Sequence, residues 1–433
     1  MQQISNLLEI EFDPVKIEGE FIRLKEKKGK KVKATLSTNK KHLRSKSLAT
    51  KESAQAFIKL LNVVDHASKE DILQILKDKS HQDILPQLID IIGASSNSNA
   101  HQALYDSKYS NPSQTSRIDL FERYMSAVAH SKHHCEDLIE NFLNDAQKAK
   151  IPHEKIKQTL ILTLARLSKK SKSSSTTVLK WIVTNLLRCK ENECHQLYLR
   201  ALKNILSPST AAILLKLAES KETDRKTALL ALEILSKFDP NVLNVKVRGL
   251  DQHLFTLLKD PDRELSLKSV AIELILLTSP STGNVKEILS LLRSENNKEL
   301  TAVALQKWTD LAQRNPHLIG QWRLCSSKGW LDWNLLSHGG LSTSFSRFLS
   351  QTLAGNSSFT FNLEVSGMLM KRSTFELKFL QENEADNSLI ELGMFAGGLS
   401  STVGQPIKDD DKDANAGMIL NVLGYQVCSC ILI

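Results

Sequence analysis

Two cysteines, Cys189 and Cys194, flank a short polar segment, Lys-Glu-Asn-Glu, between two predicted helices. A disulfide between them would close a small loop and would indicate an oxidising compartment. A zinc site is a second interpretation, but no second Cys/His pair has ligand spacing, and His195 is adjacent to Cys194 rather than offset from it. Free thiols are a third interpretation. The residues alone leave these three states open.

Other residues that could do chemistry are scattered along the chain. His133–Cys135 could suggest a metal site, but neighbouring side chains on a helix point about 100° apart and rarely share one ion. Asp409–Asp413 resembles the start of a calcium loop, yet the glycine and glutamate that such a loop needs are replaced by Ala414 and Leu420. The sequence has no phosphate-binding glycine loop, no serine elbow and no HExxH motif. We therefore expect no enzyme activity, no metal site and no cofactor.

The net charge is +9, and much of the excess lies near the N-terminus in Lys25–Lys33 and Lys40–Lys46. Such runs can bind nucleic acid or an anionic membrane surface. The first run, however, contains no aromatic side chain that would stack on a base, and Gly29 lies in its middle. We therefore interpret it as a solvated turn between two strands and expect no nucleic-acid partner.

The hydrophobic period changes partway along this chain of 433 residues, which is 41% hydrophobic and 24% charged. From about Ser47 to Trp333 apolar residues recur at helical spacing, separated by polar or proline-containing turns. Ser68–Asp71 also has the form of a capping box, with Asp in the place of Glu. Short helices with short turns favour an irregular two-layer superhelix of antiparallel pairs. The main expected helices are Lys51–Val64, Gln82–Ile92, Leu120–Ala129, Asp137–Ala146, Lys155–Leu167, Thr177–Leu187, Gln196–Leu206, Ala211–Glu219, Lys226–Phe238, Leu250–Leu258, Leu265–Leu277, Val285–Leu292 and Leu300–Ala312.

Alternating apolar residues follow the helical region and predict a β-sheet. Phe359–Val365 and Phe375–Phe379 each have one apolar face, and Gly367–Ser373 contains the turn of a hairpin between them. Leu389–Phe395 predicts a third strand and Met418–Val427 a fourth. The predicted fold class is therefore α+β and multidomain, with a helical superhelix followed by an antiparallel β-sheet.

Residues 1–45 are predicted to form strands, because Leu8–Phe12 alternates fully and Val15–Leu24 alternates in part. Two or three strands cannot form a stable domain alone, so we expect this segment to belong to something larger. The start of the sequence lacks the charged and apolar regions of a secretory signal peptide. No apolar run approaches the roughly 18–20 residues of a membrane span. We expect either a cytosolic protein or a chain that lacks its true beginning.

The order of several segments resembles that of a known family. These segments are Ile84–Ile92, the pair Cys189 and Cys194, Tyr198–Leu206 followed by Leu214–Glu219, and the hairpin Ser366–Ser373. Together they resemble the large lipid transfer proteins, the family of vitellogenin and apolipoprotein B, and within it the microsomal triglyceride transfer proteins. The resemblance runs from about Ser47 to Val427, and it rests on the order of the segments rather than on one motif.

The resemblance implies a layout of an N-terminal β-barrel, a helical superhelix and lipid-enclosing sheets. Under that layout residues 1–45 are the C-terminal remnant of the barrel, 46–335 the superhelix and 336–433 a partial lipid-facing sheet. The signal peptide, most of the barrel and the second sheet would be missing, so a partial sequence is expected. The resemblance also supports a disulfide between Cys189 and Cys194.

The function that the resemblance implies is lipid transfer in the lumen of the endoplasmic reticulum. Such a protein binds neutral lipid (triglyceride and cholesteryl ester) and phospholipid, touches membrane surfaces transiently and loads apolipoprotein B-type lipoproteins. Its expected partner is protein disulfide isomerase, docked on the helical domain. It needs an apolar concavity rather than a catalytic group. The candidate lipid-binding residues are those of the predicted hairpin's apolar face: Phe359, Phe361, Leu363, Val365, Phe375, Leu377 and Phe379.

Alternatives remain for both the site and the function. The same apolar side chains could pack against the helices as ordinary core. A vitellogenin-like lipid storage protein is the second function, and a serine-rich phosvitin-like tract, which this sequence does not show, would favour it. A cytosolic helical-repeat scaffold that binds protein or RNA is the third, and reduced Cys189 and Cys194 would favour it.

Overall fold

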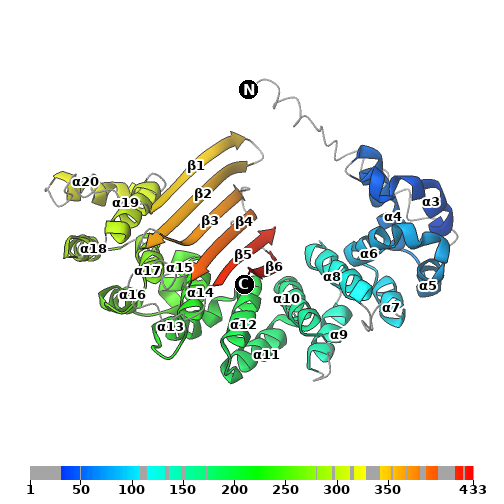
Figure 1. The fold of residues 1–433 in the computed structure, drawn as a ribbon, viewed down its shortest axis with the longest axis horizontal. Helices are drawn as coiled ribbons and strands as arrows, with labels where there is room; N and C mark the ends of the chain where they lie inside the picture. Colours follow the sequence, from blue (N-terminus) through cyan, green and yellow to red (C-terminus); the bar gives the residue numbers. More distant parts are fainter. Residues whose placement is uncertain are drawn as a thin grey trace. The chain divides into compact units, whose positions relative to one another are not determined.

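The structure is a computed structural model, and it divides into two compact units, Met1–Ser174 and Ser175–Ile433. Figure 1 shows helices first and strands after them along the chain. No helix in the described part of the chain has the length and apolar composition to cross a bilayer. The described residues are 31–48, 50–107, 115–131, 136–147, 153–171, 173–278, 280–294, 298–312, 316–327, 342–352, 355–366, 369–380, 387–397, 415–422 and 425–432.

The first unit is built from helices in two layers. They are α3 (Lys31–Asn39), α4 (Lys51–Val64), α5 (Lys69–Lys77), α6 (Leu85–Ala94), α7 (Ser98–Asp106), α8 (Thr115–His130), α9 (Glu136–Gln147) and α10 (Glu154–Lys170). One layer contains α4, α6, α8 and α10, each packed on the next, and the other contains α5, α7 and α9. This alternation is the arrangement expected for short helices joined by short turns.

Local sequence signals start two of these helices. At α4, the side chain of Thr50 accepts a hydrogen bond from the Ser53 amide. At α5, Ser68 Oγ accepts from the Asp71 amide at 3.2 Å and donates to the Asp71 carboxylate at 2.9 Å. The predicted helix start at Ser68 is therefore confirmed, with the Asp71 carboxylate bound to the Ser68 hydroxyl in place of the Ser68 amide of a full capping box.

The strands predicted over residues 1–45 are wrong for the part of that range that the structure describes, since Lys31–Asn39 is the helix α3. The physical reason is spacing. Val32 and Leu36 are four residues apart, which puts both on one face of a helix, and both are buried. The alternating segments before residue 31 lie outside the described residues, so the barrel remnant is not confirmed.

The second unit begins with helices in two layers. They are α11 (Ser175–Arg188), α12 (Asn192–Ile205), α13 (Ala211–Glu219), α14 (Arg225–Leu235), α15 (Pro240–Lys246), α16 (Leu250–Lys259), α17 (Leu265–Leu277), α18 (Thr282–Ser294), α19 (Lys298–Ala312) and α20 (Pro316–Ser327). α12, α14, α17 and α19 pack on one another in that order, and α11, α13 and α16 pack on the first three. The predicted two-layer helical arrangement is confirmed within each unit.

Two helices occupy segments that the sequence predicts as breaks. α7 begins inside the polar run Ser95–Asn99, where the side chain of Asn97 accepts a hydrogen bond from the Asn99 amide. α15 begins at Pro240, and the side chain of Asp239 accepts from the next two amides. Polar residues and proline stop helices but also start them, because they satisfy or remove the free amides of the first turn.

An antiparallel sheet completes the second unit (Figure 1). Its strands are β1 (Thr343–Thr352), β2 (Gly355–Ser366), β3 (Leu369–Leu380), β4 (Asn387–Gly397), β5 (Asn415–Val422) and β6 (Tyr425–Leu432). They pair in chain order, each with the next. The predicted hairpin is confirmed as β2 and β3, and the predicted third strand as β4. The single strand predicted over Met418–Val427 is wrong, because that segment spans the end of β5 and the start of β6.

The register of the sheet puts like side chains opposite one another. One row across five strands consists of Phe345, Phe361, Phe375, Leu392 and Leu420. The next row consists of Ser346, Thr360, Glu376, Glu391 and Asn421. Successive residues of a strand point to opposite faces, so one face of this sheet is mainly apolar and the other mainly polar, although Phe395 and Ile419 also lie on the polar face.

Candidate functional site

The burial of β2 shows which face of the sheet meets the helices. The polar residues Ser358 and Glu364 are 1% and 0% exposed, whereas Phe359 and Phe361 are only half-buried. The polar face therefore packs on the layer that contains α14, α17 and α19, and the aromatic side chains point away from it. This reverses the usual arrangement, in which the apolar face of an antiparallel sheet covers the core.

The opposite side of the sheet, which we call the outward apolar face, is continuous from β1 to β5. Phe345 is 44% exposed, and its ring centroid lies 5.6 Å from that of Phe359 and 5.5 Å from that of Phe361. Phe359 in turn stacks on Phe375 at 6.2 Å. Contiguous exposed apolar surface of this kind is rare on proteins that bind nothing there, and it usually marks a site for a ligand, a membrane or another protein. The face consists of Phe345, Phe359, Phe361, Leu363, Phe375, Leu377, Ile390, Leu392, Met394, Met418, Leu420 and Val422.

The structure brings together five of the seven candidate residues predicted from the hairpin. Phe359, Phe361, Leu363, Phe375 and Leu377 share the outward apolar face, opposite the face that carries the charges paired with the helices. Val365 is set apart, because the register shifts between Glu364 and Val365 and its side chain is only 6% exposed. Phe379 lies opposite Ser357 in the ladder, and its side chain is outside the described part of the structure.

Sequence reasoning missed the extension of this face onto the flanking strands. Phe345 lies in β1, a strand that the sequence did not predict, and Ile390, Met394 and Met418 lie in β4 and β5 and are each 39–42% exposed. A signal was present, since Ile390, Leu392 and Met394 alternate. The intervening Glu391 marks the opposite, polar face.

The helix-facing side of the sheet carries buried charges, and each has a partner. Glu391 accepts from Lys203 Nζ of α12 at 3.1 Å and from Asn421 Nδ2 at 2.7 Å, and Lys237 Nζ lies 3.9 Å from it. Lys237 also donates to Glu376 of β3 at 2.9 Å. Burial alone would raise the pKa of Glu391, but Lys203 and Lys237 more than offset it and hold that pKa far below its usual range.

A second cluster surrounds Arg372 of β3. Its guanidinium lies 2.6 Å from the Glu233 carboxylate of α14 and 3.2 Å from that of Glu364 in β2. Nearby, Lys307 of α19 donates to Glu273 of α17 at 2.7 Å. Burial would lower the pKa of Arg372, but Glu233 and Glu364 raise it, so the side chain stays charged. Burial would raise the pKa values of Glu364 and Glu273, and neighbouring cations lower them.

These two clusters form what we call the sheet–helix ion network. Transfer of a charge out of water is costly unless the charge is paired, and each charge of this network has an oppositely charged neighbour, although Glu364 Oε2 and Asn421 Oδ1 are buried without a hydrogen bond. The network therefore favours packing of the polar face on the helices, since the aromatic and aliphatic side chains of the outward apolar face cannot pair with these charges. It consists of Lys203, Glu233, Lys237, Glu273, Lys307, Glu364, Arg372, Glu376, Glu391 and Asn421.

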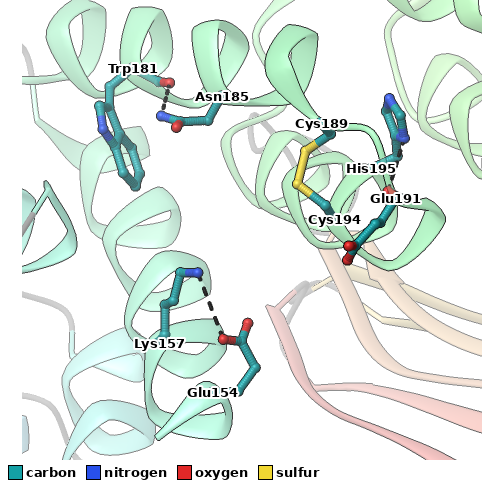
Figure 2. Close-up of a disulfide and its surroundings, with 8 residues drawn as sticks. All are labelled: Glu154, Lys157, Trp181, Asn185, Cys189, Glu191, Cys194 and His195. Atoms are coloured by element: carbon teal, nitrogen blue, oxygen red, sulfur yellow. Dashed lines mark hydrogen bonds and ion pairs between the residues drawn. A yellow bond between two sulfur atoms is a disulfide. The ribbon is translucent and has the colours of Figure 1, made fainter. Parts of the chain in front are cut away.

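Cys189 and Cys194 form a disulfide with their Cα atoms 5.6 Å apart. Cys189 directly follows α11 and Cys194 lies in the first turn of α12, so the bond closes the turn between these helices (Figure 2). His195 is engaged with the Glu191 carbonyl, 3.1 Å from its Nδ1. The disulfide is therefore the state found among the three that the sequence left open.

No group of three metal-ligating side chains that could hold an ion occurs among the described residues. The two segments with a weak metal signal, His133–Cys135 and Asp409–Asp413, lie outside those residues. The chemistry that the described site offers is apolar contact on one face of the sheet and ion pairing on the other.

The sequence model of a family described as Vitellogenin TPR domain matches residues 30–307, which covers the helices from α3 to most of α19. The chain belongs to this vitellogenin family. The match ends before the sheet, so the outward apolar face lies outside the matched residues.

Curated relatives extend the likeness of this vitellogenin-family chain into the sheet. The chain is 28% identical to the microsomal triacylglycerol transfer protein of Drosophila melanogaster over 404 residues, covering 89% of this chain and 45% of the relative. It is 24% identical to the microsomal triglyceride transfer protein large subunit of Sus scrofa, covering 90% of this chain and 43% of the relative. The chain thus spans under half the length of these relatives.

A solved structure shares the fold of this vitellogenin-family chain. It is a structure of lipovitellin, described for its lipid–protein interactions, and it matches 94% of this chain and 44% of its own with a TM-score of 0.72. The two sequences are 17% identical over the match. The order of a helical array followed by an open antiparallel sheet is therefore common to both proteins.

Proposed function

We propose that this chain acts in lipid transfer and that lipid binds on its outward apolar face. The cargo is neutral lipid, meaning triglyceride and cholesteryl ester, together with phospholipid. The observation that carries the proposal is the orientation of the sheet. Its charged side is buried in the sheet–helix ion network, and aromatic and aliphatic side chains from β1 to β5 are left open. The names of the curated relatives support the same function.

The delivery step and the compartment belong to the same proposal. The protein loads lipid onto apolipoprotein B-type lipoproteins in the lumen of the endoplasmic reticulum and touches membranes only transiently. The disulfide between Cys189 and Cys194 supports an oxidising compartment. Protein disulfide isomerase is the expected partner, docked on the helical part of the chain. The proposal needs no catalytic residue, because transfer requires only reversible apolar contact.

The test of the site is a pair of charges placed at its centre. Phe359→Asp with Phe361→Asp puts two carboxylates where acyl chains would lie. Each apolar side chain that is lost from a lipid contact is worth about 1.5–3 kcal/mol, or roughly 10- to 150-fold in affinity. The measurement is binding of a triglyceride with a fluorescent acyl chain, delivered from phosphatidylcholine vesicles.

A matched control comes from the helical part of the same unit. Val245 of α15 is 77% exposed and lies outside the sheet, so Val245→Asp adds a charge without touching the outward apolar face. The proposal predicts that this variant binds lipid as the parent chain does. Equal lipid binding by the Phe359/Phe361 variant and the parent chain would contradict the assignment of the lipid site to the outward apolar face.

The partner is tested by expression in an oxidising secretory host with protein disulfide isomerase present. A complex of fixed stoichiometry in size-exclusion chromatography is the expected result. A folded chain that elutes free of the isomerase would contradict the partner assignment. That result would not bear on the lipid site, which the phenylalanine variants test.

A vitellogenin-like lipid storage or transport protein is the second candidate function. The family match and the lipovitellin likeness favour it. The two functions differ in exchange rate, because a transfer protein must release its lipid. Movement of labelled triglyceride from donor to acceptor vesicles within minutes supports transfer, whereas lipid that stays bound for hours supports storage.

A further inference from the structure

Among the side chains that the structure describes, one cation lies on the outward apolar face. Arg347 of β1 is opposite Phe359 in the ladder and two residues from Phe345, so it shares the outward side with both. It heads a row across the sheet whose other members are all apolar: Phe359, Leu377, Ile390 and Val422. Its side chain is exposed.

The other charged strand residues whose side chains the structure describes lie on the opposite side. Glu364, Arg372, Glu376, Lys378 and Glu391 alternate with the outward residues and face the helices. Within the described ranges Arg347 has no ion pair and no side-chain hydrogen bond, whereas Arg372 has two carboxylates within 3.2 Å. Arg347 is thus a cation without a counter-charge, beside a wall of aromatic rings.

A guanidinium in this position matches one class of ligand. Its planar fork donates two parallel hydrogen bonds to a phosphate, and such charge-assisted bonds are stronger than neutral ones. From β1 to β5 the wall spans four strand spacings, about 19 Å, which is comparable to an extended fatty acyl chain. A lipid whose phosphate is at β1 can therefore lay its acyl chains over the apolar rows.

We propose that Arg347 positions the phosphate of a phospholipid whose acyl chains lie on the outward apolar face. The inference rests on the proposed function and adds a specificity-determining residue to it. Triglyceride has no phosphate and uses the wall alone, so Arg347 separates the two lipid classes. The alternative is a structural role for Arg347. Exposed charges on edge strands prevent aggregation, so the residue would keep β1 from pairing with another chain.

The experiment compares two lipids that carry the same fluorescent acyl chain, phosphatidylglycerol and a triglyceride, both delivered from phosphatidylcholine vesicles. For Arg347→Gln we expect the ratio of phosphatidylglycerol to triglyceride affinity to fall about tenfold, the lower end for a lost charge-assisted hydrogen bond. Arg347→Lys should recover part of the ratio, because it restores charge but not the fork. Arg347→Glu should lower the ratio further.

The control variant is Arg188→Gln, the same change at an exposed arginine at the end of α11. It should leave the ratio as in the parent chain. Glycerol 3-phosphate at millimolar concentration should not compete with the labelled phospholipid. Effective competition would assign the site to free phosphate groups and overturn the phospholipid assignment.

Two outcomes separate this inference from the proposed function. If the Phe359/Phe361 variant loses both lipids while the Arg347 variants keep the parent ratio, the wall binds lipid and the Arg347 assignment is wrong. If the Phe359/Phe361 variant keeps both lipids, the proposed function fails at its own site. Equal ratios in the Gln, Lys and Glu variants, together with aggregation of the neutral Gln variant alone, would assign Arg347 to edge protection.

Discussion

The helix-facing and outward faces of the sheet differ in chemistry and in surroundings. On the helix-facing side, Glu364 is fully buried and paired with Arg372, and Glu391 is paired with two lysines. On the outward side, Phe345 and Ile390 are 44% and 42% exposed. Hydropathy alone would bury the second face and expose the first. The difference teaches that the partners available on the helices, rather than the average polarity of a face, decide which face is covered.

The same comparison predicts where the molecule is sensitive. Removal of a charge from the helix-facing side leaves its partners buried without a counter-ion, which is costly. Removal of an apolar side chain from the outward face changes little in the folded state, because much of that side chain already meets solvent. Stability and ligand binding should therefore depend on opposite faces of one sheet.

Arg372→Leu should have the largest effect on stability. It leaves the fully buried Glu364 and the half-buried Glu233 without their arginine, and loss of one partner from a buried ion pair costs about 3–5 kcal/mol. Urea unfolding followed by circular dichroism measures the change in the free energy of unfolding. Arg188→Leu, on the exposed end of α11, is the matched control and should stay within about 0.5 kcal/mol of the parent chain. A loss below about 1 kcal/mol at Arg372 would show that the network is not holding the sheet.

Acid should weaken the helix-facing side next. The pKa values of Glu273, Glu364 and Glu391 lie below the ordinary value, since neighbouring cations outweigh burial. The unfolded chain, with glutamate pKa values of about 4.3, therefore binds more protons than the folded chain. The stability that these groups contribute is present above about pH 4.3 and is lost as pH falls through the folded pKa values. The Tm should be flat from pH 8 to 6 and should drop below pH 4; a Tm that rises on acidification would contradict the assignment.

Gly417→Ala should have a smaller effect on the same face. A methyl group at Gly417 would overlap the ring of Phe395, with Cε1 only 2.6 Å away, and that ring lies under Lys226 Nζ at 5.6 Å. Overpacking of this kind costs about 1–3 kcal/mol. The free energy of unfolding should fall by that amount. Gly283→Ala, where the nearest atom is a serine hydroxyl 3.5 Å away, serves as the control and should not destabilise the chain.

Phe345→Thr should have the smallest effect on stability and a clear effect on binding. Threonine suits a strand, and the phenylalanine is already 44% exposed, so the free energy of unfolding should change by about 1 kcal/mol or less. Loss of its apolar contact with lipid should weaken triglyceride binding by about tenfold. The paired measurement decides the comparison of the two faces. A stability loss as large as that of Arg372→Leu, with binding intact, would mean that the outward face is ordinary core.

Much of the fold could be predicted because its signals are local. The apolar stripe of α4 and the capping box at Ser68 each lie within one or two helical turns. The hairpin of β2 and β3 likewise follows from alternation in two short segments. The prolines were an ambiguous signal, because proline can end a helix or begin one. Pro240 begins α15 where the sequence predicts a turn. The helix at Val32 and Leu36 was missed because charged lysines hid its two buried positions.

The orientation of the sheet could not be predicted, although five of the seven candidate residues of the hairpin share one face. Alternation in Phe359–Val365 gives two faces and does not say which one is covered. The answer depends on Glu233, Lys237 and Lys307, which lie far earlier in the chain and look like ordinary surface charges. The break at Val365 was equally hidden, because a shift of register depends on the neighbouring strand.

The pairing of the strands in chain order has a consequence for how the sheet is made. Each strand finds its partner in the segment synthesised just before it, so the sheet can grow one hairpin at a time with short loop closures. Lys203, Glu233 and Lys307 of the helices, and Lys237 of the turn after α14, all leave the ribosome before β1. These charged side chains are therefore already present when each strand emerges. Each new strand can pack its polar side on them, while its aromatic side stays exposed to solvent during synthesis.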